Sequence, residues 1–326
     1  MRNMICSVVV LLLLSSCGKT EKKADDEFLP DASGAINNVS VVTENDYWDG
    51  RVGDAIRSVL TKPIYGLPQD EPMFSISQIP PSVFSGFVTK NRTVLLIKPN
   101  KEQGLEILTN VYAKPQKVIV VSGKTREEII EELSKNESKI IETFRHEELA
   151  ERQRQMMKSP HTFKSIKEKL GLSIQFASIY RKATETDNFF WFRKDITTGT
   201  NNLMIYELPF DAIQRNDSVV KQIIKIRDSI GKAYIQGPLE GSYMVTEDAY
   251  APFIEETTID NKPAFETRGI WDVKNAFMGG PFINYAIEDS KNNRWVVIEG
   301  FSFAPSVEKR NYMLELESII RSVKIE

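Results

Sequence analysis

Three short stretches in the C-terminal half of the sequence carry residues whose types and spacing suit ligand binding. Residues 189–192, Phe-Phe-Trp-Phe, place aromatic rings on both faces of one expected strand, where they fill a core or form a binding platform. Residues 268–271, Arg-Gly-Ile-Trp, set a guanidinium among aromatic rings, where it can bind a carboxylate, stack on a ring or pair with a structural acid. Residues 278–282, Met-Gly-Gly-Pro-Phe, suit a tight turn or the wall of a cleft. The candidate binding surface comprises Phe189, Trp191, Arg268, Trp271, Gly279, Gly280, Pro281 and Phe282.

Two motifs for phosphate and zinc chemistry are incomplete in this sequence. Residues 122–125, Ser-Gly-Lys-Thr, lie between an expected strand and an expected helix, but Val118 occupies the position of the first P-loop glycine. We therefore expect Thr125 and Glu128 to form a helix capping box. Residues 146–150, His-Glu-Glu-Leu-Ala, begin like a zinc-binding helix, but Ala150 replaces the second histidine. A solvated helix is the preferred interpretation there.

Carboxylates are the remaining groups that could perform acid–base chemistry. The chain has two histidines and two cysteines, so we expect no metal site, no cofactor and no histidine-based nucleophile. Glu255 and Glu256 are neighbours, but on a strand they would face opposite sides. Residues 25–27, Asp-Asp-Glu, lie in an expected tether. A hydrolase or transferase that acts on envelope glycan or peptide is therefore an alternative that depends on carboxylates brought together by the fold.

The N-terminus predicts export and lipid attachment. Arg2 precedes an apolar run over residues 5–14, which is too short to span a bilayer and suits a signal peptide. Residues 14–17, Leu-Ser-Ser-Cys, resemble the lipobox of bacterial lipoproteins, in which the cysteine thiol is acylated. We expect residues 1–16 to be the signal peptide and acyl chains on Cys17 to anchor the protein to a membrane. An ordinary secretory signal cut elsewhere, or a short uncleaved anchor, is the alternative.

Composition limits the classes of partner. The formal net charge is −3, and no basic stripe with interleaved aromatic residues occurs, so we expect no nucleic-acid partner. Residues 17–36 are polar and of mixed charge, which predicts a flexible tether. Cys6 would leave with the signal peptide, so acylation of Cys17 leaves the mature protein without a free thiol.

Apolar periodicity beyond the tether predicts an α+β fold of two lobes, residues 37–158 and 159–326. Each lobe is expected to resemble an α/β sandwich, with a mostly antiparallel sheet covered by helices. One long helix over about residues 126–157 would project from the body or bridge it, with Glu148 and Arg152 paired one turn apart. Residues 61–87 contain five prolines alternating with apolar residues, which indicates an ordered segment that is neither helix nor central strand.

The C-terminal lobe has the clearer element pattern. Strands are expected over residues 174–181, 188–195 and 203–208, and a helix over residues 217–234. Turn residues at 260–262 and 290–293 predict two hairpins, and residues 308–323 predict a closing amphipathic helix. A shorter helix should begin at Ser159-Pro160 and end at Gly171.

Several of these segments together resemble a family of Bacteroidetes lipoproteins that is catalogued as domain of unknown function 4837. The resemblance spans most of the mature chain, and it implies an envelope lipoprotein with no established activity and no catalytic residues to transfer. The residues that carry it fall in seven segments: residues 47–50, Tyr-Trp-Asp-Gly, with Gly53-Asp54; residues 66–69, Gly-Leu-Pro-Gln; residues 72–75, Pro-Met-Phe-Ser; residues 80–85, Pro-Pro-Ser-Val-Phe-Ser; residues 114–116, Lys-Pro-Gln; residues 268–271, Arg-Gly-Ile-Trp; and residues 279–282, Gly-Gly-Pro-Phe.

The sequence predicts an outer-membrane lipoprotein, facing the periplasm rather than the cell surface. The expected role is a non-enzymatic binding or assembly module with an envelope protein partner. The alternatives are the carboxylate-based enzyme and a small-ligand carrier that uses the aromatic strand. Ser218 and Ser229 each lie in an Asp-Ser-apolar triplet, which resembles an O-glycosylation acceptor of Bacteroidetes; capping and helix interior are the simpler interpretations.

Overall fold

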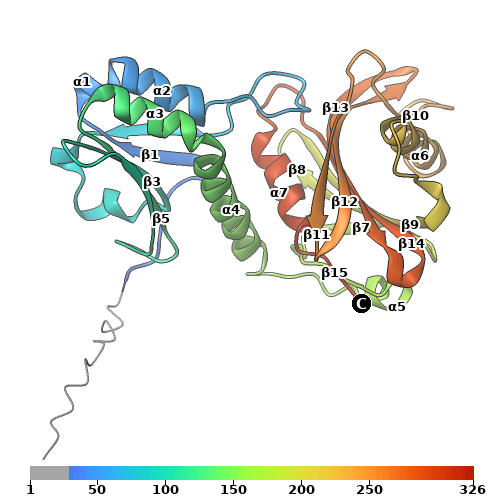
Figure 1. The fold of residues 1–326 in the computed structure, drawn as a ribbon. Helices are drawn as coiled ribbons and strands as arrows, with labels where there is room; N and C mark the ends of the chain where they lie inside the picture. The colour runs from blue at the N-terminus through green and yellow to red at the C-terminus, as the bar shows by residue number, and fades with distance from the viewer. Residues whose placement is uncertain (1–28) are drawn as a thin grey trace, which may run out of the picture.

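The computed structural model describes residues 29–326, which fold into two sheet-containing lobes connected through the helix α4 (Figure 1). The predicted signal peptide and Cys17 lie outside the described residues. The prediction of a flexible tether up to residue 36 is wrong at its end, because residues 30–33 make backbone hydrogen bonds with residues 90–92 and with Lys114. Within residues 29–326, none of the helices is both long enough and apolar enough to cross a bilayer. Both lobes combine helices and sheets, so the predicted α+β class is confirmed.

The sheet of the N-terminal lobe differs from the antiparallel expectation. Its strand order is β2-β1-β3-β5-β4, and every neighbouring pair except β4 with β5 is parallel. The central strands are continuous runs of buried β-branched and leucine residues, which is the pattern of strands covered on both faces in a parallel sheet. The strands are β1 (Asn38–Val42), β2 (Ser75–Ile79), β3 (Thr93–Pro99), β4 (Gly104–Thr109) and β5 (Lys117–Gly123).

Helices cover one face of this sheet, and the segment around two short 3₁₀ helices covers part of the other. The predicted long helix is instead two helices that meet at Asn136, whose ψ of 16° departs from α-helical geometry. Its amide Nδ2 bonds the Glu132 carboxylate and carbonyl, which stabilises this break. The helical elements are α1 (Asn45–Trp48), α2 (Arg51–Leu60), η1 (Pro81–Val83), η2 (Gly86–Lys90), α3 (Arg126–Lys135) and α4 (Glu137–Met156).

The C-terminal lobe is built on one antiparallel eight-stranded sheet, as expected. Its order is β10-β12-β13-β14-β9-β8-β7, and β11 also pairs with β12. Both predicted hairpins are confirmed, since β11 turns into β12 through Asp260 and Asn261 and β13 turns into β14 through η4. The strands are β7 (Arg181–Glu185), β8 (Phe189–Ile196), β9 (Gly199–Pro209), β10 (Tyr243–Thr246), β11 (Phe253–Ile259), β12 (Lys262–Lys274), β13 (Ala276–Asp289) and β14 (Arg294–Phe303).

Two helices cover opposite faces of this sheet and enclose two separate cores (Figure 1). Helix α7 packs so closely that a Cβ on Gly300 would lie 2.6 Å from the Cβ of Leu316. Helix α6 covers the other face. The remaining elements are α5 (Ser165–Leu170), β6 (Leu172–Ser173), η3 (Phe210–Ala212), α6 (Val219–Tyr234), η4 (Ser290–Asn292), α7 (Arg310–Ile320) and β15 (Lys324–Ile325).

Two expectations for residues 159–181 were wrong. The short helix begins at Ser165 rather than near Pro160, because residues 159–161 bond in an extended manner to residues 176–178. Most of the predicted strand over residues 174–181 is irregular, although it carries Phe176 and Tyr180 into the core beneath α7. Gly171 ends α5 in the left-handed conformation, as predicted.

Residues 61–74 form a clasp that runs from the N-terminal lobe onto the C-terminal lobe. Leu67 is buried in the core between the C-terminal sheet and α7. Gly66 has a φ of +81°, and a Cβ there would lie 2.8 Å from the Cβ of Arg268, so this crossing requires glycine. The carboxylate of Glu71 accepts hydrogen bonds from the backbone N–H groups of Lys309 and Arg310 at 2.7–2.9 Å. The clasp thus supplies the anion at the N-terminus of α7.

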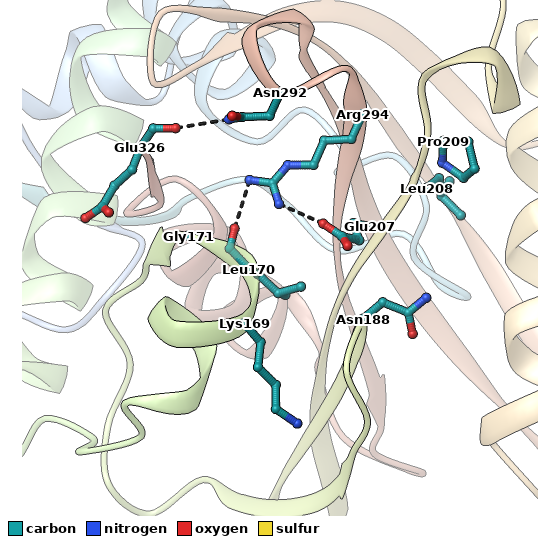
Figure 2. Close-up of a pocket in the computed structure, with 10 residues that line it drawn as sticks. All are labelled: Lys169, Leu170, Gly171, Asn188, Glu207, Leu208, Pro209, Asn292, Arg294 and Glu326. Atoms are coloured by element: carbon teal, nitrogen blue, oxygen red, sulfur yellow. Dashed lines mark hydrogen bonds and ion pairs between the residues drawn. The ribbon is translucent and has the colours of Figure 1, made fainter.

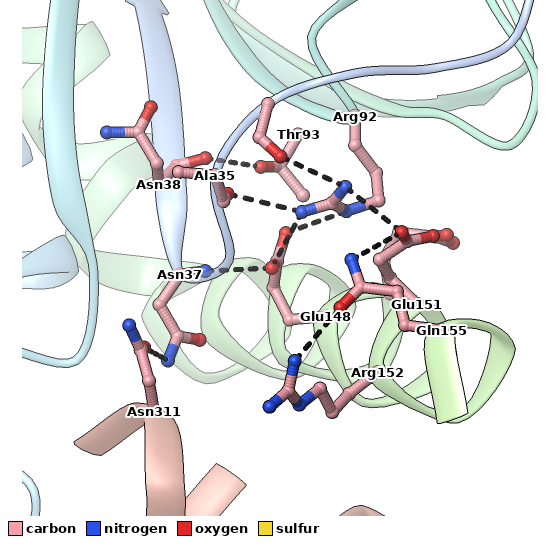
Figure 3. Close-up of polar contacts among 12 residues, drawn as sticks. Ala35, Asn37, Asn38, Arg92, Thr93, Glu148, Glu151, Arg152, Gln155 and Asn311 are labelled. Atoms are coloured by element: carbon pink, nitrogen blue, oxygen red, sulfur yellow. Dashed lines mark hydrogen bonds and ion pairs between the residues drawn. The ribbon is translucent and has the colours of Figure 1, made fainter. Parts of the chain in front are cut away.

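Helices α4 and α7 form the other main contact between the lobes. Two buried carboxylates of α7 form salt bridges with arginines of α4: Glu317 pairs with Arg145, and Glu315 pairs with Arg152. The predicted pairing of Glu148 with Arg152 is therefore wrong. Glu148 is instead fully buried and accepts two hydrogen bonds from Arg92, at 3.0 and 3.1 Å (Figure 3). The expectation of a solvated helix at residues 146–150 fails for the same reason.

Candidate functional site

The predicted binding-surface residues divide between the two faces of the C-terminal sheet. Because side chains alternate along a strand, Arg268 faces α7, whereas Trp271, three residues later on β12, faces α6. Phe189, Trp191 and Phe282 also belong to the α6 side. The structure therefore brings the four aromatic residues of the predicted set to one face and separates Arg268 from them.

Trp191 and Trp271 line a pocket of about 300 Å³ at the end of α6. Helix α6 ends at Tyr234, and the pocket lies just beyond this end, where Ile235 and Gln236 contribute to its lining. Trp271 is fully buried and donates its indole N–H to the carbonyl of Ser302 at 3.2 Å. The apolar lining of this aromatic pocket consists of Trp191, Ile235, Trp271, Val273, Met278, Phe301 and Phe303.

Hydrogen bonds hold the half-buried indole of Trp191 in place. Its Nε1 donates to Oδ1 of Asn202 at 3.1 Å, and Nδ2 of Asn202 donates to Oγ1 of Thr200 at 3.1 Å. Arg193 and Asp195 continue along β8 on the same face and also line the pocket. The aromatic pocket thus combines an apolar floor with a polar edge, and its exposed aromatic wall is fixed before any ligand arrives.

The other predicted residues on the α6 side have structural roles. Phe189 is buried and stacks on Tyr234 with ring centroids 3.9 Å apart. Phe282 is buried beneath the guanidinium of Arg227, at 3.8 Å from its ring centroid. A Cβ on Gly280 would lie 2.1 Å from the Ser302 carbonyl oxygen, so the glycine permits β13 to approach β14. Gly279 and Pro281 pair with Asp272 and Ile270 of β12, so they lie in a strand and not in a tight turn, although the register shifts directly beyond Gly279.

Arg268 lines a second pocket, of about 450 Å³, between the two lobes. The N-terminal lobe contributes clasp residues and Arg145, and the C-terminal lobe contributes Arg268 with two glutamates. Tyr65 and Phe253 stack across the junction, with ring centroids 5.2 Å apart and planes within 9°. The lining of this interlobe pocket consists of Lys62, Pro63, Ile64, Tyr65, Met73, Arg145, Phe253, Glu255, Glu266 and Arg268.

The interlobe pocket contains the kind of carboxylate pair that an enzyme alternative requires. Glu255 and Glu266 are cross-strand partners on one face. Glu266 is committed to structure, since it accepts hydrogen bonds from Arg268 and Tyr285 at 2.5 Å and pairs with Arg321 at 3.3 Å. Burial and the neighbouring Glu266 raise the pKa of Glu255. Hydrolysis by a carboxylate pair needs two available carboxyl groups, whereas Glu266 is already held by Arg268, Tyr285 and Arg321. The arrangement therefore favours a binding role over two-carboxylate hydrolysis.

A larger pocket, of about 690 Å³, lies beside the C-terminal strand, but its charged groups already have partners (Figure 2). Arg294 donates to the Leu170 carbonyl at 2.8 Å and pairs with Glu207 at 2.7 Å. Lys169 pairs with Glu185 at 3.2 Å, and Asn292 donates to the Glu326 backbone oxygen at 3.1 Å. These contacts tie the C-terminus to the sheet, which is a structural role.

The two incomplete motifs have structural roles: residues 122–125 lead into the start of α3, and residues 146–150 lie in the interior of α4. Thr125 accepts a hydrogen bond from the backbone N–H of Glu128, as predicted, and the Glu128 carboxylate accepts from the N–H of Lys124. Ser218 and Ser229 are both exposed, so their predicted glycosylation stays a prediction.

Sequence reasoning missed the residues that complete both pockets. Asn202 lies at a buried strand position where nothing in the sequence distinguishes it from a structural amide. Tyr65 lies in the proline-rich segment, whose order was expected but whose path onto the other lobe was not. A signal for the clasp was present in Gly66, since a glycine beside apolar and proline residues often marks a close backbone approach.

Two family models match consecutive parts of the chain. The first, described as domain of unknown function DUF8532, matches residues 32–157, which include both helices α3 and α4. The second, described as domain of unknown function DUF4837, matches residues 159–322, which include the whole C-terminal sheet and the helices α6 and α7 on its two faces. No curated protein matches the chain. The chain therefore belongs to the DUF4837 family.

Proposed function

We propose that this protein is a lipid-anchored binding or assembly module of the outer membrane that faces the periplasm and holds a saccharide ring in its aromatic pocket. The anchor rests on the lipobox-like residues 14–17 and the apolar run before them. Mass spectrometry of the native protein should find Cys17 acylated at the new N-terminus. An unmodified thiol or an intact residue 1 would overturn this address.

The observation that carries the binding role is the fixed indole of Trp191 in the wall of the aromatic pocket. A pyranose ring has one face of C–H groups and an edge of hydroxyl groups. The C–H face suits an aromatic wall, and the hydroxyl edge suits the charged side chains of Arg193 and Asp195. A volume of about 300 Å³ is at the small end of ligand pockets and suits one ring of a longer glycan.

Calorimetric titration with soluble N-acetylglucosamine oligomers and with mannose oligomers tests this role. The wild-type protein should bind at least one oligomer, and Trp191→Ala should weaken that binding about fivefold or more, because stacking on an aromatic ring contributes of the order of 1 kcal/mol beyond area burial. Tyr65→Ala is the matched control, since it removes an exposed aromatic ring from the other pocket. Equal affinity for the wild type and Trp191→Ala would contradict the proposal.

An envelope protein partner is the second part of the proposal. The two lobes are held together through buried contacts, so the protein presents a fixed surface that includes the exposed side chains of Phe87 and Phe277. Crosslinking in intact cells, followed by purification from detergent-solubilised outer membrane, should recover a stable partner. Repeated recovery of the protein alone would count against an assembly role.

A further inference from the structure

Two apolar side chains protrude from the N-terminal lobe at the 3₁₀ helices η1 and η2. Phe87 is 72% exposed and Val83 is 58% exposed. Phe84, between them, instead packs edge-on against Tyr112, with ring centroids 5.6 Å apart. Gly86 turns the chain there with a φ of +59° and has open space around it. Val83 and Phe87, the apolar ridge, therefore lie outside the core that the same segment helps to form.

The described chain enters the N-terminal lobe beside this ridge. The backbone N–H of Ser33 donates to the Lys90 carbonyl at 2.9 Å, and that of Arg92 donates to the Ser33 carbonyl at 2.8 Å. The side-chain amide of Gln116 donates to the Thr89 carbonyl at 2.7 Å. Helix η2, which carries half of the ridge, is therefore hydrogen-bonded directly to the point where the chain enters the body.

The proposed lipid anchor leaves little chain between a membrane and this point of entry. A segment as long as residues 17–29 spans about 20 Å as a coil, and at most about 40 Å when fully extended. The C-terminal lobe lies beyond α4, further from the point of entry (Figure 1). A bilayer that holds the acyl chains therefore lies closest to the face that carries the ridge.

The charges beside the ridge are compatible with a lipid surface. Lys90 ends η2, and Lys114 exchanges backbone hydrogen bonds with residues 30–32 at the point of entry. Asp31 is the acidic residue of that segment. Lysines near a bilayer are attracted by lipid phosphates, and an exposed phenylalanine suits the boundary between headgroups and acyl chains.

We infer that the apolar ridge inserts into the bilayer that holds Cys17, as a second membrane contact beside the lipid anchor. The inference rests on the proposed function, since it requires acyl chains on that cysteine. Two contacts fix the orientation of the body, whereas acyl chains alone leave it free to turn. Phe87 is then a lipid contact, and Phe277, exposed on the hairpin of β12 and β13, remains for a protein partner.

The experiment measures the depth of a nitroxide label in protein reconstituted into vesicles of phosphatidylethanolamine and phosphatidylglycerol. The acylated mature chain has no other cysteine, so one introduced cysteine accepts the label. Val83→Cys places the label on the ridge and keeps Phe87, and Phe277→Cys is the matched control on the other lobe. Electron paramagnetic resonance compares relaxation by oxygen, which concentrates in lipid, with relaxation by a water-soluble nickel chelate.

Oxygen should relax the label at position 83 more than the chelate does, and the order should reverse at position 277. Adding Phe87→Ser to Val83→Cys should shift the label toward the chelate, because an apolar side chain leaves the bilayer. Adding Tyr65→Ser, which removes an exposed ring of the clasp, should leave the label unchanged.

Two failures are distinguishable. If acylated protein floats with the vesicles but its label at position 83 is as open to the chelate as that at position 277, the ridge inference is overturned and the anchor stands. An unchanged label in the Phe87→Ser variant would likewise overturn the insertion of the ridge. Protein that does not float, with a free thiol at Cys17 by mass spectrometry, would overturn the anchor and this inference with it.

Discussion

The two faces of the eight-stranded sheet neutralise their buried carboxylates differently. On the α7 face, Glu317 is surrounded by Arg145, Arg268 and Arg321, and these cations lower its pKa although burial opposes ionisation. On the α6 face, Glu299 has one guanidinium partner, Arg227 at 2.9 Å, and burial dominates and raises its pKa. The three cations around Glu317 therefore outweigh its burial, whereas the single cation beside Glu299 does not.

The same two faces differ in what they leave open. The α7 face is closed by the N-terminal lobe through α4 and the clasp, so its charged groups mainly hold the two lobes together. On the α6 face, a pocket lies beyond the end of α6 at Tyr234, and aromatic residues line it. We conclude that the charged groups of the α7 face mainly stabilise the molecule, whereas the fixed aromatic wall of the α6 face is available for a saccharide ligand.

The largest effect is expected on the closed face. Glu317→Ala should lower the free energy of unfolding by about 3–5 kcal/mol, because it leaves buried guanidinium groups without their carboxylate. Urea unfolding followed by circular dichroism measures the change. Glu127→Ala, in an exposed pair with Arg51, is the control and should change the free energy by less than about 1 kcal/mol. A small effect of Glu317→Ala would show that the α7 face does not hold the lobes together.

The clasp should contribute through its buried leucine. Leu67→Ala should cost about 3 kcal/mol, since it removes a leucine that the N-terminal segment inserts into the C-terminal core. Hydrogen exchange should also show faster exchange of amides in α7 than in α6. Uniform protection of both helices in the variant would contradict the role of the clasp.

The loss of stability at acid pH should depend on the buried carboxylates of the α7 face. Glu315 and Glu317 have lowered pKa values, because the nearby arginine and lysine charges outweigh burial. Their contribution is present above the unfolded pKa, about 4.5, and is lost as the pH falls below it toward the folded values. Each such carboxylate adds up to about 1.4 kcal/mol per pH unit to the slope.

Unfolding free energies of the wild type, Glu317→Gln and Glu299→Gln between pH 3 and 7 measure these slopes, because the effect of Glu317 lies below pH 4.5 and that of Glu299 above it. The wild type should lose stability more steeply as the pH falls, since glutamine does not titrate. Glu299→Gln should shift the dependence in the opposite sense, because a raised folded pKa makes stability fall as the pH rises through the interval between the two values. Identical slopes in all three proteins would contradict the contrast between the faces.

The smallest effect on stability is expected on the open face. Trp191→Ala should cost only about 1 kcal/mol, because the indole is half-exposed and leaves a site that is already open to solvent. Thermal unfolding of the variant measures this cost. A loss as large as that of Glu317→Ala would mean that Trp191 is a core residue and not a binding wall.

The sequence predicted local elements better than their assembly. The hairpin at Asp260-Asn261 and the end of α5 at Gly171 follow from residues that tolerate left-handed backbone. The parallel N-terminal sheet was missed, because pairing direction depends on crossovers and not on the strand residues alone. Charged side chains such as Glu148 and Arg152 were assigned partners one turn apart, whereas their true partners are 56 and 163 residues away.

The candidate site was predicted only in part, because residue types can be read from the sequence but long-range contacts cannot. Trp191 and Trp271 were identified by residue type, and strand alternation brings both to the α6 face. Arg268 was grouped with them by sequence proximity, although alternation places it on the opposite face. The interlobe pocket could not be predicted, because it depends on the clasp crossing between lobes.

Fluorine NMR of protein labelled with 5-fluorotryptophan, titrated with N-acetylglucosamine and mannose oligomers, tests the open face most directly. The chain has four tryptophans, and only Trp191 and Trp271 line the aromatic pocket. We expect the resonances of these two to shift with an oligomer, while those of Trp48 and Trp295 stay unchanged. Shifts confined to Trp48 and Trp295, or no shift at saturating oligomer, would contradict a ligand site on the α6 face.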